Sequence, residues 1–105
     1  RDAILSSLII DRDPALAADR ADRVAMTEAF AAQMIATTDD LGLDPSRVNP
    51  HGGAIALGHP WGASGALQVV RLFADLDGRD GTSGLALAAV AGGMGSAAWF
   101  EASPS

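Results

Sequence analysis

The stretch GGAIALGHPWGASGA, residues 52–66, holds one titratable side chain, His59, among small and apolar residues. Gly58 and Pro60 flank the histidine and a helix is predicted to begin near Trp61, so the imidazole would project from a rigid corner. The dipole of that helix start favours a neutral ring, which can accept a proton or donate a hydrogen bond to an oxyanion. A structural histidine at a helix start is the alternative, and this motif alone does not separate the two.

The composition indicates a globular chain and excludes several classes of protein. The 105 residues suffice for one domain, and nearly half of them are apolar. The net charge of −6 argues against a nucleic-acid partner, and no apolar run approaches the roughly 20 residues that span a membrane. The chain has no cysteine, so a disulfide, a thiol nucleophile and a thiolate metal site are excluded. We expect no metal and a cytoplasmic location.

The sequence opens at Arg1 rather than at a methionine, so we expect a fragment, a processed subunit or part of something longer. Several segments rich in alanine and valine have the pattern of elements that are buried on both faces, which a small isolated domain does not readily achieve. The chain is therefore predicted to pack against other protein, in a homo- or hetero-oligomer.

The predicted elements alternate between helices and strands and end in a hairpin, which indicates a layered α/β fold. Residues 3–10 form an apolar run that suits a helix or a strand, and a short helix is predicted over residues 14–21. Thr27 is the predicted N-cap of the next helix, with Glu28 in its first turn. A strand is predicted over 23–26, and the helix that follows Thr27 is predicted to end near 38. A further helix is predicted over 61–77, with a buried stripe of Ala66, Val69, Val70, Phe73 and Leu76. The last two elements are a strand over 85–90 that is covered on both faces and a strand over 97–101.

Two further motifs contain groups that could take part in catalysis or in oxyanion binding. TEAFAAQ, residues 27–33, offers a hydroxyl and a carboxylate at a strand-to-helix junction, although helix capping explains both. AVAGGMG, residues 89–95, is a glycine-rich corner between two buried strands, where exposed N–H groups can serve an oxyanion. An ordinary hairpin corner explains the second motif equally well.

Together, TEAFAAQ, NPHGGAIALGHPWGASGA (49–66) and GLALAAVAGGMGSA (84–97) resemble, in order and spacing, the C-terminal half of the thiolases. Thiolases are acyl-CoA acyltransferases that join or cleave 3-ketoacyl-CoA thioesters. The resemblance covers residues 23–101 and implies a layered α/β domain, a mixed sheet with flanking helices, over residues 23–105. Residues 1–22 match poorly and are predicted to be an N-terminal extension or the remnant of a longer chain.

The resemblance implies that His59 activates a cysteine supplied by an N-terminal thiolase half or large subunit and helps to hold the thioester oxyanion. Thr27 stands where the family has an asparagine that holds an oxyanion-hole water, and Ala89 stands where the family has an acid/base cysteine. The substrate is implied to be a coenzyme A thioester, with no permanently bound cofactor. Residues implied in substrate binding are Ala29, Phe30, Ala91, Gly92 and Gly93.

Two functions remain open at this stage. One is the C-terminal portion or subunit of a thiolase-like acyltransferase, for which the motif at 52–66 is intact. The other is a non-catalytic or altered-chemistry homologue, used for acyl-CoA binding, for assembly or as a retro-aldol partner, because Thr27 and Ala89 both depart from the family's pattern. A structural module without a ligand is a third possibility, which the glycine-rich corner around His59 disfavours.

Overall fold

The computed structural model describes residues 19–102, and its centre is a mixed three-stranded sheet in the order β1-β2-β3. Strand β1 (Arg23–Met26) runs parallel to β2 (Ser83–Val90), and β2 pairs antiparallel with β3 (Met94–Glu101). Val24 also makes an isolated parallel bridge with Val48. The predicted mixed sheet and terminal hairpin are confirmed.

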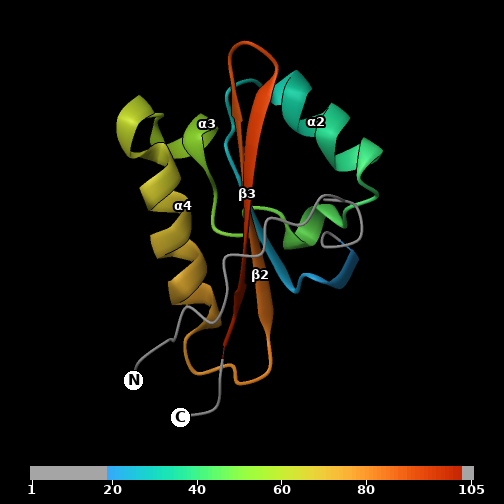
Figure 1. The fold of residues 1–105 in the computed structure, drawn as a ribbon, viewed down its shortest axis with the longest axis vertical. Coiled ribbons are helices and arrows are strands. Elements are labelled where there is room, and N and C mark those ends of the chain that lie inside the picture. Colours follow the sequence, from blue (N-terminus) through green and yellow to red (C-terminus); the bar gives the residue numbers. More distant parts are fainter. Residues whose placement is uncertain (1–18, 103–105) are drawn as a thin grey trace.

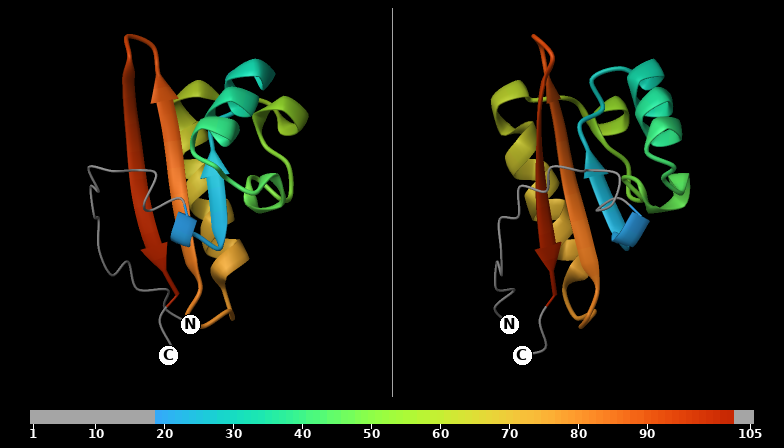
Figure 2. Two further views of the ribbon diagram at one scale, coloured as in Figure 1. Left: turned by 90° about the vertical axis from the view of Figure 1, so that its right-hand side faces the viewer. Right: turned by 45° about the vertical axis from the view of Figure 1, so that its right-hand side comes forward.

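Helices cover both faces of the sheet, which gives three layers (Figures 1 and 2). Helix α2 (Ala31–Asp40) lies on one face and α4 (Trp61–Leu76) on the other, while the 3-10 helix η1 (Pro45–Arg47) and the short α3 (Ala54–Leu57) lie in the connection between α2 and α4. Each face has its own core. The buried apolar residues are Ala21, Val24, Met26 and Leu85 on the α2 side and Ala25, Leu72, Leu76, Ala86 and Phe100 on the α4 side.

Helix α4 approaches the sheet closely because β2 has a glycine at the point of contact. A Cβ built on Gly84 would lie 2.7 to 2.9 Å from Cγ, Cδ1 and Cδ2 of Leu72. Leu72 is 1% exposed and is held among other core residues, so it has no space into which to retreat. The seam between Leu72 and Gly84 therefore sets the distance between α4 and the central strand.

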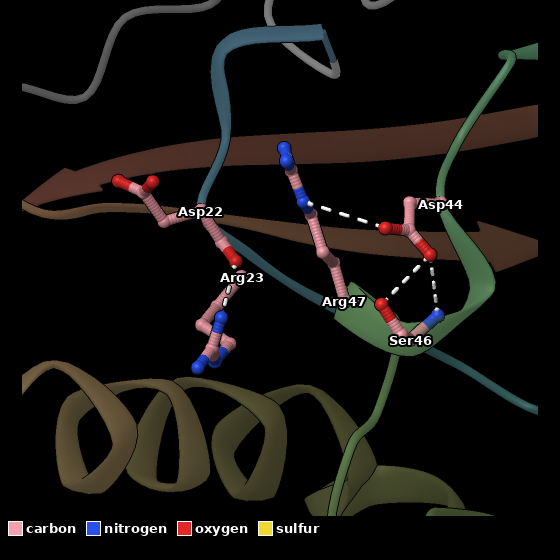
Figure 3. Close-up of polar contacts among 5 residues, drawn as sticks. All are labelled: Asp22, Arg23, Asp44, Ser46 and Arg47. Atoms are coloured by element: carbon pink, nitrogen blue, oxygen red, sulfur yellow. Dashed lines mark hydrogen bonds and ion pairs between the residues drawn. The ribbon is translucent and has the colours of Figure 1, made fainter.

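Polar contacts fix the amino ends of the parallel strands and the start of η1. The Asp22 carboxylate accepts hydrogen bonds from the backbone N–H and the hydroxyl of Ser83, at 2.8 and 3.2 Å. Asp44 caps η1 by accepting from the Ser46 N–H and hydroxyl, and Arg47 lies 3.8 Å away (Figure 3). The hydrogen bonds from Ser46 lower the pKa of the Asp44 carboxyl, since they stabilise its charged form.

The predicted start of the second helix was wrong by several residues. The N-cap of α2 is Phe30, in extended conformation, and not Thr27. The Thr27 N–H continues the β ladder to the Leu87 carbonyl at 3.0 Å, and the Glu28 carboxylate bonds to a distant backbone N–H, that of Ile55. These tertiary hydrogen bonds keep both residues extended and outweigh the local preference for capping.

The predicted buried face of α4 was correct in part: Leu76 is buried, and Val69 and Phe73 are half-buried and pack against the core, whereas Ala66 is exposed. The buried residues are Ser64, Gln68, Leu72 and Leu76, four residues apart, whereas Val70 is 64% exposed. Polar Ser64 and Gln68 belong to the buried face because each has a hydrogen-bond partner there, which apolar periodicity cannot indicate.

Strand β2 is also less covered than predicted. Its first half is buried, but Ala89 and Val90 are exposed because they lie beyond the end of β1. Strand β3 begins at Met94, three residues earlier than predicted, and its antiparallel register pairs Ala89 with Gly95. The end of the hairpin is therefore a two-stranded ribbon with exposed side chains.

The predicted apolar element over residues 3–10 lies outside the described residues, as does most of the predicted helix over 14–21, although residues 19 and 20 are helical. Across residues 19–102, each helix is too short or too polar to cross a lipid bilayer.

Replacing Gly84 by Ala is expected to reduce the free energy of unfolding by about 1–3 kcal/mol, because the added methyl overpacks the Leu72 seam. The matched control is Gly65→Ala in α4, where a Cβ meets no atom within 4 Å and helix propensity favours Ala by about 1 kcal/mol. Denaturant unfolding measures both variants. Equal stability of the two variants would contradict the close approach of α4.

Candidate active site

The three motifs singled out in the sequence lie toward the same end of the molecule (Figure 1). Residues 27–30 follow the carboxyl end of β1, and residues 91–93 form the turn after the carboxyl end of β2. His59 lies between α3 and α4, at the amino end of α4 on the same side of the molecule. Carboxyl ends of parallel strands and amino ends of helices are where α/β proteins commonly bind ligands.

The ring of His59 is partly exposed and is held by one hydrogen bond, in which Nδ1 lies 2.5 Å from the Ser64 hydroxyl. A hydroxyl can donate to Nδ1 or accept from it. In the first case Nε2 carries the proton and can donate it to an oxyanion, and in the second Nε2 is a free base. Gly58, with φ of +96°, turns the chain into the corner, a conformation that residues with a side chain rarely adopt.

The segment that leads to His59 is tied to the end of β1 by Asn49 and Glu28. Asn49 Nδ2 donates to the Met26 carbonyl and to Glu28 Oε1, and Asn49 Oδ1 accepts from the Met26 N–H, at 2.8 to 2.9 Å. The Ile55 N–H donates to Glu28 Oε2 at 2.8 Å. A Cβ on Gly53 would clash with the Glu28 carboxylate, so a side chain there would displace that carboxylate from its hydrogen bonds. These bonds place α3 and hence His59.

Thr27 is 7% exposed and faces α4 rather than solvent. Its Oγ1 lies 2.5 Å from the side-chain amide of Gln68, which is also 7% exposed. Gln68 follows Ser64 by one helical turn on the same buried face of α4. One face of one helix therefore holds both His59 and Thr27, the two predicted polar site residues.

The other predicted site residues lie at the same end of the molecule and are exposed. Phe30 is 75% exposed at the start of α2, next to the exposed Ala29. Ala89 is the second-last residue of β2. The turn that follows contains Ala91, Gly92 and Gly93, and both glycines have positive φ, at +91° and +74°.

A cavity of about 740 Å³ lies next to this end, between α2, α4 and the hairpin. Ala89 lies on its wall, as do Gln68 of α4 and Gln33 of α2. Gln33 Oε1 is buried and has no hydrogen-bond partner among the described residues, so the cavity wall carries an unpaired acceptor.

Large apolar side chains are exposed around the same end. Isolated exposed apolar residues are normal, but a contiguous group marks a surface that another protein or a ligand covers. The side chains on α3, on the first turn of α4 and on the hairpin that are more than half exposed are Ile55, Leu57, Trp61, Val90 and Met94.

Comparison with known proteins identifies this arrangement. The family profile described as thiolase, C-terminal domain, matches residues 6–102. The chain belongs to the thiolase family. The resemblance found in the sequence is thereby confirmed, and the layered α/β fold is that of solved thiolases.

Curated thiolases and solved thiolase structures support the assignment. The acetyl-CoA acetyltransferase of Paracoccus denitrificans is 51% identical over 80 residues, and a beta-ketothiolase of Cupriavidus necator is 49% identical; each match covers 76% of this chain and 20% of the relative. This thiolase domain thus spans about one fifth of these relatives. The peroxisomal 3-ketoacyl-CoA thiolase of Saccharomyces cerevisiae superposes with a TM-score of 0.75 at 41% identity, over 81% of this chain and 24% of that one. A thiolase of Ascaris suum in complex with coenzyme A superposes with a TM-score of 0.75 at 40% identity, over 80% of this chain and 22% of that one.

Sequence reasoning missed the residues that hold the predicted ones, namely Ser64, Gln68, Asn49 and Glu28. Ser64 and Gln68 do carry a signal, because polar residues four apart lie in line with Leu72 and Leu76 on α4. For Asn49 and Glu28 the partners are 21 residues apart in the sequence, and no local pattern joins them.

Replacing Asn49 by Asp is expected to reduce the free energy of unfolding by about 2–3 kcal/mol, because a carboxylate would face the Met26 carbonyl and the Glu28 carboxylate. Asn49→Gly is the matched control. It removes the side chain but tolerates the φ of +43° at this position, so the excess loss in Asn49→Asp reports the charge. Urea unfolding measures both, and an Asn49→Asp variant at least as stable as Asn49→Gly would rule out this contact.

Proposed function

We propose that this thiolase domain is the C-terminal portion or subunit of an acyltransferase that acts on coenzyme A thioesters and that His59 belongs to its catalytic centre. The position of the His59 ring carries the proposal. The ring is partly exposed, is hydrogen-bonded to Ser64 and belongs to the end of the molecule toward which the three motifs lie. The names of the relatives, acetyl-CoA acetyltransferase and beta-ketothiolase, support this chemistry.

His59 acts first as a base. The Ser64 hydroxyl accepts from Nδ1–H, and Nε2 takes the proton of a cysteine thiol on a partner segment. The resulting thiolate attacks the thioester carbonyl carbon, and the carbonyl oxygen becomes an oxyanion. The imidazolium then stabilises that oxyanion through its Nε2 proton, so one ring serves both steps.

The departure of coenzyme A completes acyl transfer to the cysteine. The carbon–sulfur bond of the substrate breaks, the carbonyl re-forms, and the His59 imidazolium returns its proton to the leaving thiolate. Ala89 has no titratable atom, so this chain offers no second acid/base at the position where the family has one. The proposal therefore separates acyl transfer, which His59 suffices to assist, from carbon–carbon bond formation, which also needs removal of an α-proton.

The partner in this proposal is an N-terminal thiolase half or large subunit that carries the cysteine, and it covers the exposed apolar side chains around His59, including Trp61, which is 85% exposed. The yeast thiolase is described as a five-layered structure built from two core domains of identical topology. A second domain on this face agrees with that description. The proposal further includes a cytoplasmic location, a role in lipid metabolism, oligomeric assembly and no bound cofactor.

His59→Ala in the complete assembly is expected to lower acyl transfer from acetyl-CoA by about 10²- to 10⁴-fold, because both the base and the oxyanion contact are lost. Stopped-flow or discontinuous measurement of free coenzyme A gives the rate. The matched control is His51→Ala, which removes the other histidine, an exposed residue paired with Asp75 at 2.9 Å. Equal turnover in His59→Ala and His51→Ala would end the assignment of His59.

An altered-chemistry homologue is the second candidate, and Ala89 favours it. Because the side chain at position 89 is exposed at the end of the ribbon and lines the cavity, Ala89→Cys adds a thiol without disturbing the core. If the chain is an acyltransferase whose α-proton step is impaired, Ala89→Cys raises acetoacetyl-CoA formation by about 10²- to 10⁴-fold and leaves acetylation of the cysteine unchanged. Ala91→Cys, in the turn, controls for an added thiol elsewhere.

The two rates separate the candidates. A gain in carbon–carbon bond formation in Ala89→Cys, absent in Ala91→Cys, means that the site retains thiolase geometry and argues against altered chemistry. No gain, with undiminished acyl-CoA binding, favours the homologue that binds acyl-CoA for another purpose.

A further inference from the structure

The buried amide of Gln68 is a polar group that neither the family resemblance nor the proposed function uses. It lies on α4 next to Thr27, which follows β1, and Leu87 of β2, and it is 7% exposed. Burying an amide costs free energy unless both of its ends are hydrogen-bonded, so its partners reveal its purpose.

The orientation of the amide decides what it does to Thr27. When Nε2 faces Thr27, the nitrogen donates to Oγ1 at 2.5 Å. When the amide is turned by 180°, Oε1 accepts from the Thr27 hydroxyl at 2.5 Å and shares the Thr27 N–H, 2.6 Å away, with the Leu87 carbonyl, and Nε2 donates to the Leu87 carbonyl at 3.1 Å. The turned orientation satisfies both ends of the amide, so it is the stable one in a buried site.

We infer that Gln68 is a positioning residue of the proposed active site: its amide oxygen accepts the hydrogen bond of the Thr27 hydroxyl and thereby leaves Thr27 Oγ1 as a hydrogen-bond acceptor toward other groups. With the hydroxyl proton committed to Gln68, the free lone pairs of Oγ1 hold a proton donor such as a water molecule. That water keeps its second proton for the oxyanion. Gln68 thus determines that Thr27 Oγ1 accepts, and does not donate, the hydrogen bond with that water.

The same helix face links this pair to His59. Ser64 and Gln68 are four residues apart, about 6 Å along α4, and they bond to His59 and Thr27 respectively. Gln68 also bridges β1 and β2 through Thr27 and Leu87. Because α4 is rigid, the two site residues keep a fixed separation as long as both bonds are present.

This inference rests on the proposed function, and the test compares Thr27→Val, Gln68→Met and the double variant in the complete assembly, with acetyl-CoA as substrate. Val and Met keep the size of the side chains and remove the hydroxyl and the amide. Each single variant is expected to lower kcat by about 10- to 100-fold with KM nearly unchanged, because misplacement of an oxyanion contact affects the transition state. The double variant is expected to be no slower than the slower single variant, since the two residues act as one unit.

Thr27→Ser is the conservative control and is expected to keep a kcat close to that of the parent, because the hydroxyl remains. A purely structural role of Gln68 predicts lower unfolding free energy with an unchanged kcat per folded molecule, and that result would overturn the inference. Losses in kcat that multiply in the double variant would also overturn it.

His59→Ala distinguishes failure of the inference from failure of the proposed function. If His59→Ala is inactive and Gln68→Met retains the parental kcat, the role of Gln68 is wrong while the acyltransferase proposal stands. If His59→Ala keeps full activity, the proposed function fails and the inference fails with it.

Discussion

The packing of one face of α4 against β1 and β2 is the constraint on which the rest of the structure depends. The carboxyl-terminal half of this face is apolar, and there Leu72 and Leu76 complete a core and Leu72 packs against Gly84. The amino-terminal half of this face is polar, and there Ser64 and Gln68 form hydrogen bonds with His59 and Thr27 respectively. The apolar half stabilises the fold, and because the helix is continuous, the same contact places the polar half at the ends of the strands.

Two kinds of interaction position different parts of the candidate site. The hairpin and the strand ends are set by the sheet ladder, whereas the connection between α2 and α4 is irregular and is held by side chains. Asn49 pairs with Met26 through both ends of its amide, as an additional strand residue would, and Glu28 bonds to the start of α3. Loops near active sites are commonly fixed in this way by a rigid scaffold, since regular structure does not reach them.

The elements with strong periodicity could be predicted from the sequence, and the contacts between them could not. Strand 23–26, helix α4 and the terminal hairpin could be predicted, because apolar runs and the Gly92-Gly93 pair mark them. The start of α2 was misplaced since Thr27 and Glu28 bond to residues far away in the sequence. The buried face of α4 was predicted only in part for the same reason, because a glutamine is stable in a core only when it has a hydrogen-bond partner there. The corner at His59 before α4 could be predicted from the sequence, while the residues that hold the ring required coordinates.

The ribbon at the end of β2 and β3 extends past β1, and this geometry bears on how the family can diversify. Position 89 is exposed and pairs with Gly95 across the hairpin, so packing places little constraint on its side chain. A thiol, a methyl or another small group can occupy it without a cost in folding. Evolution is then free to exchange reactivity at this point while the scaffold stays intact, and a lineage can lose one chemical step and acquire another through a single codon.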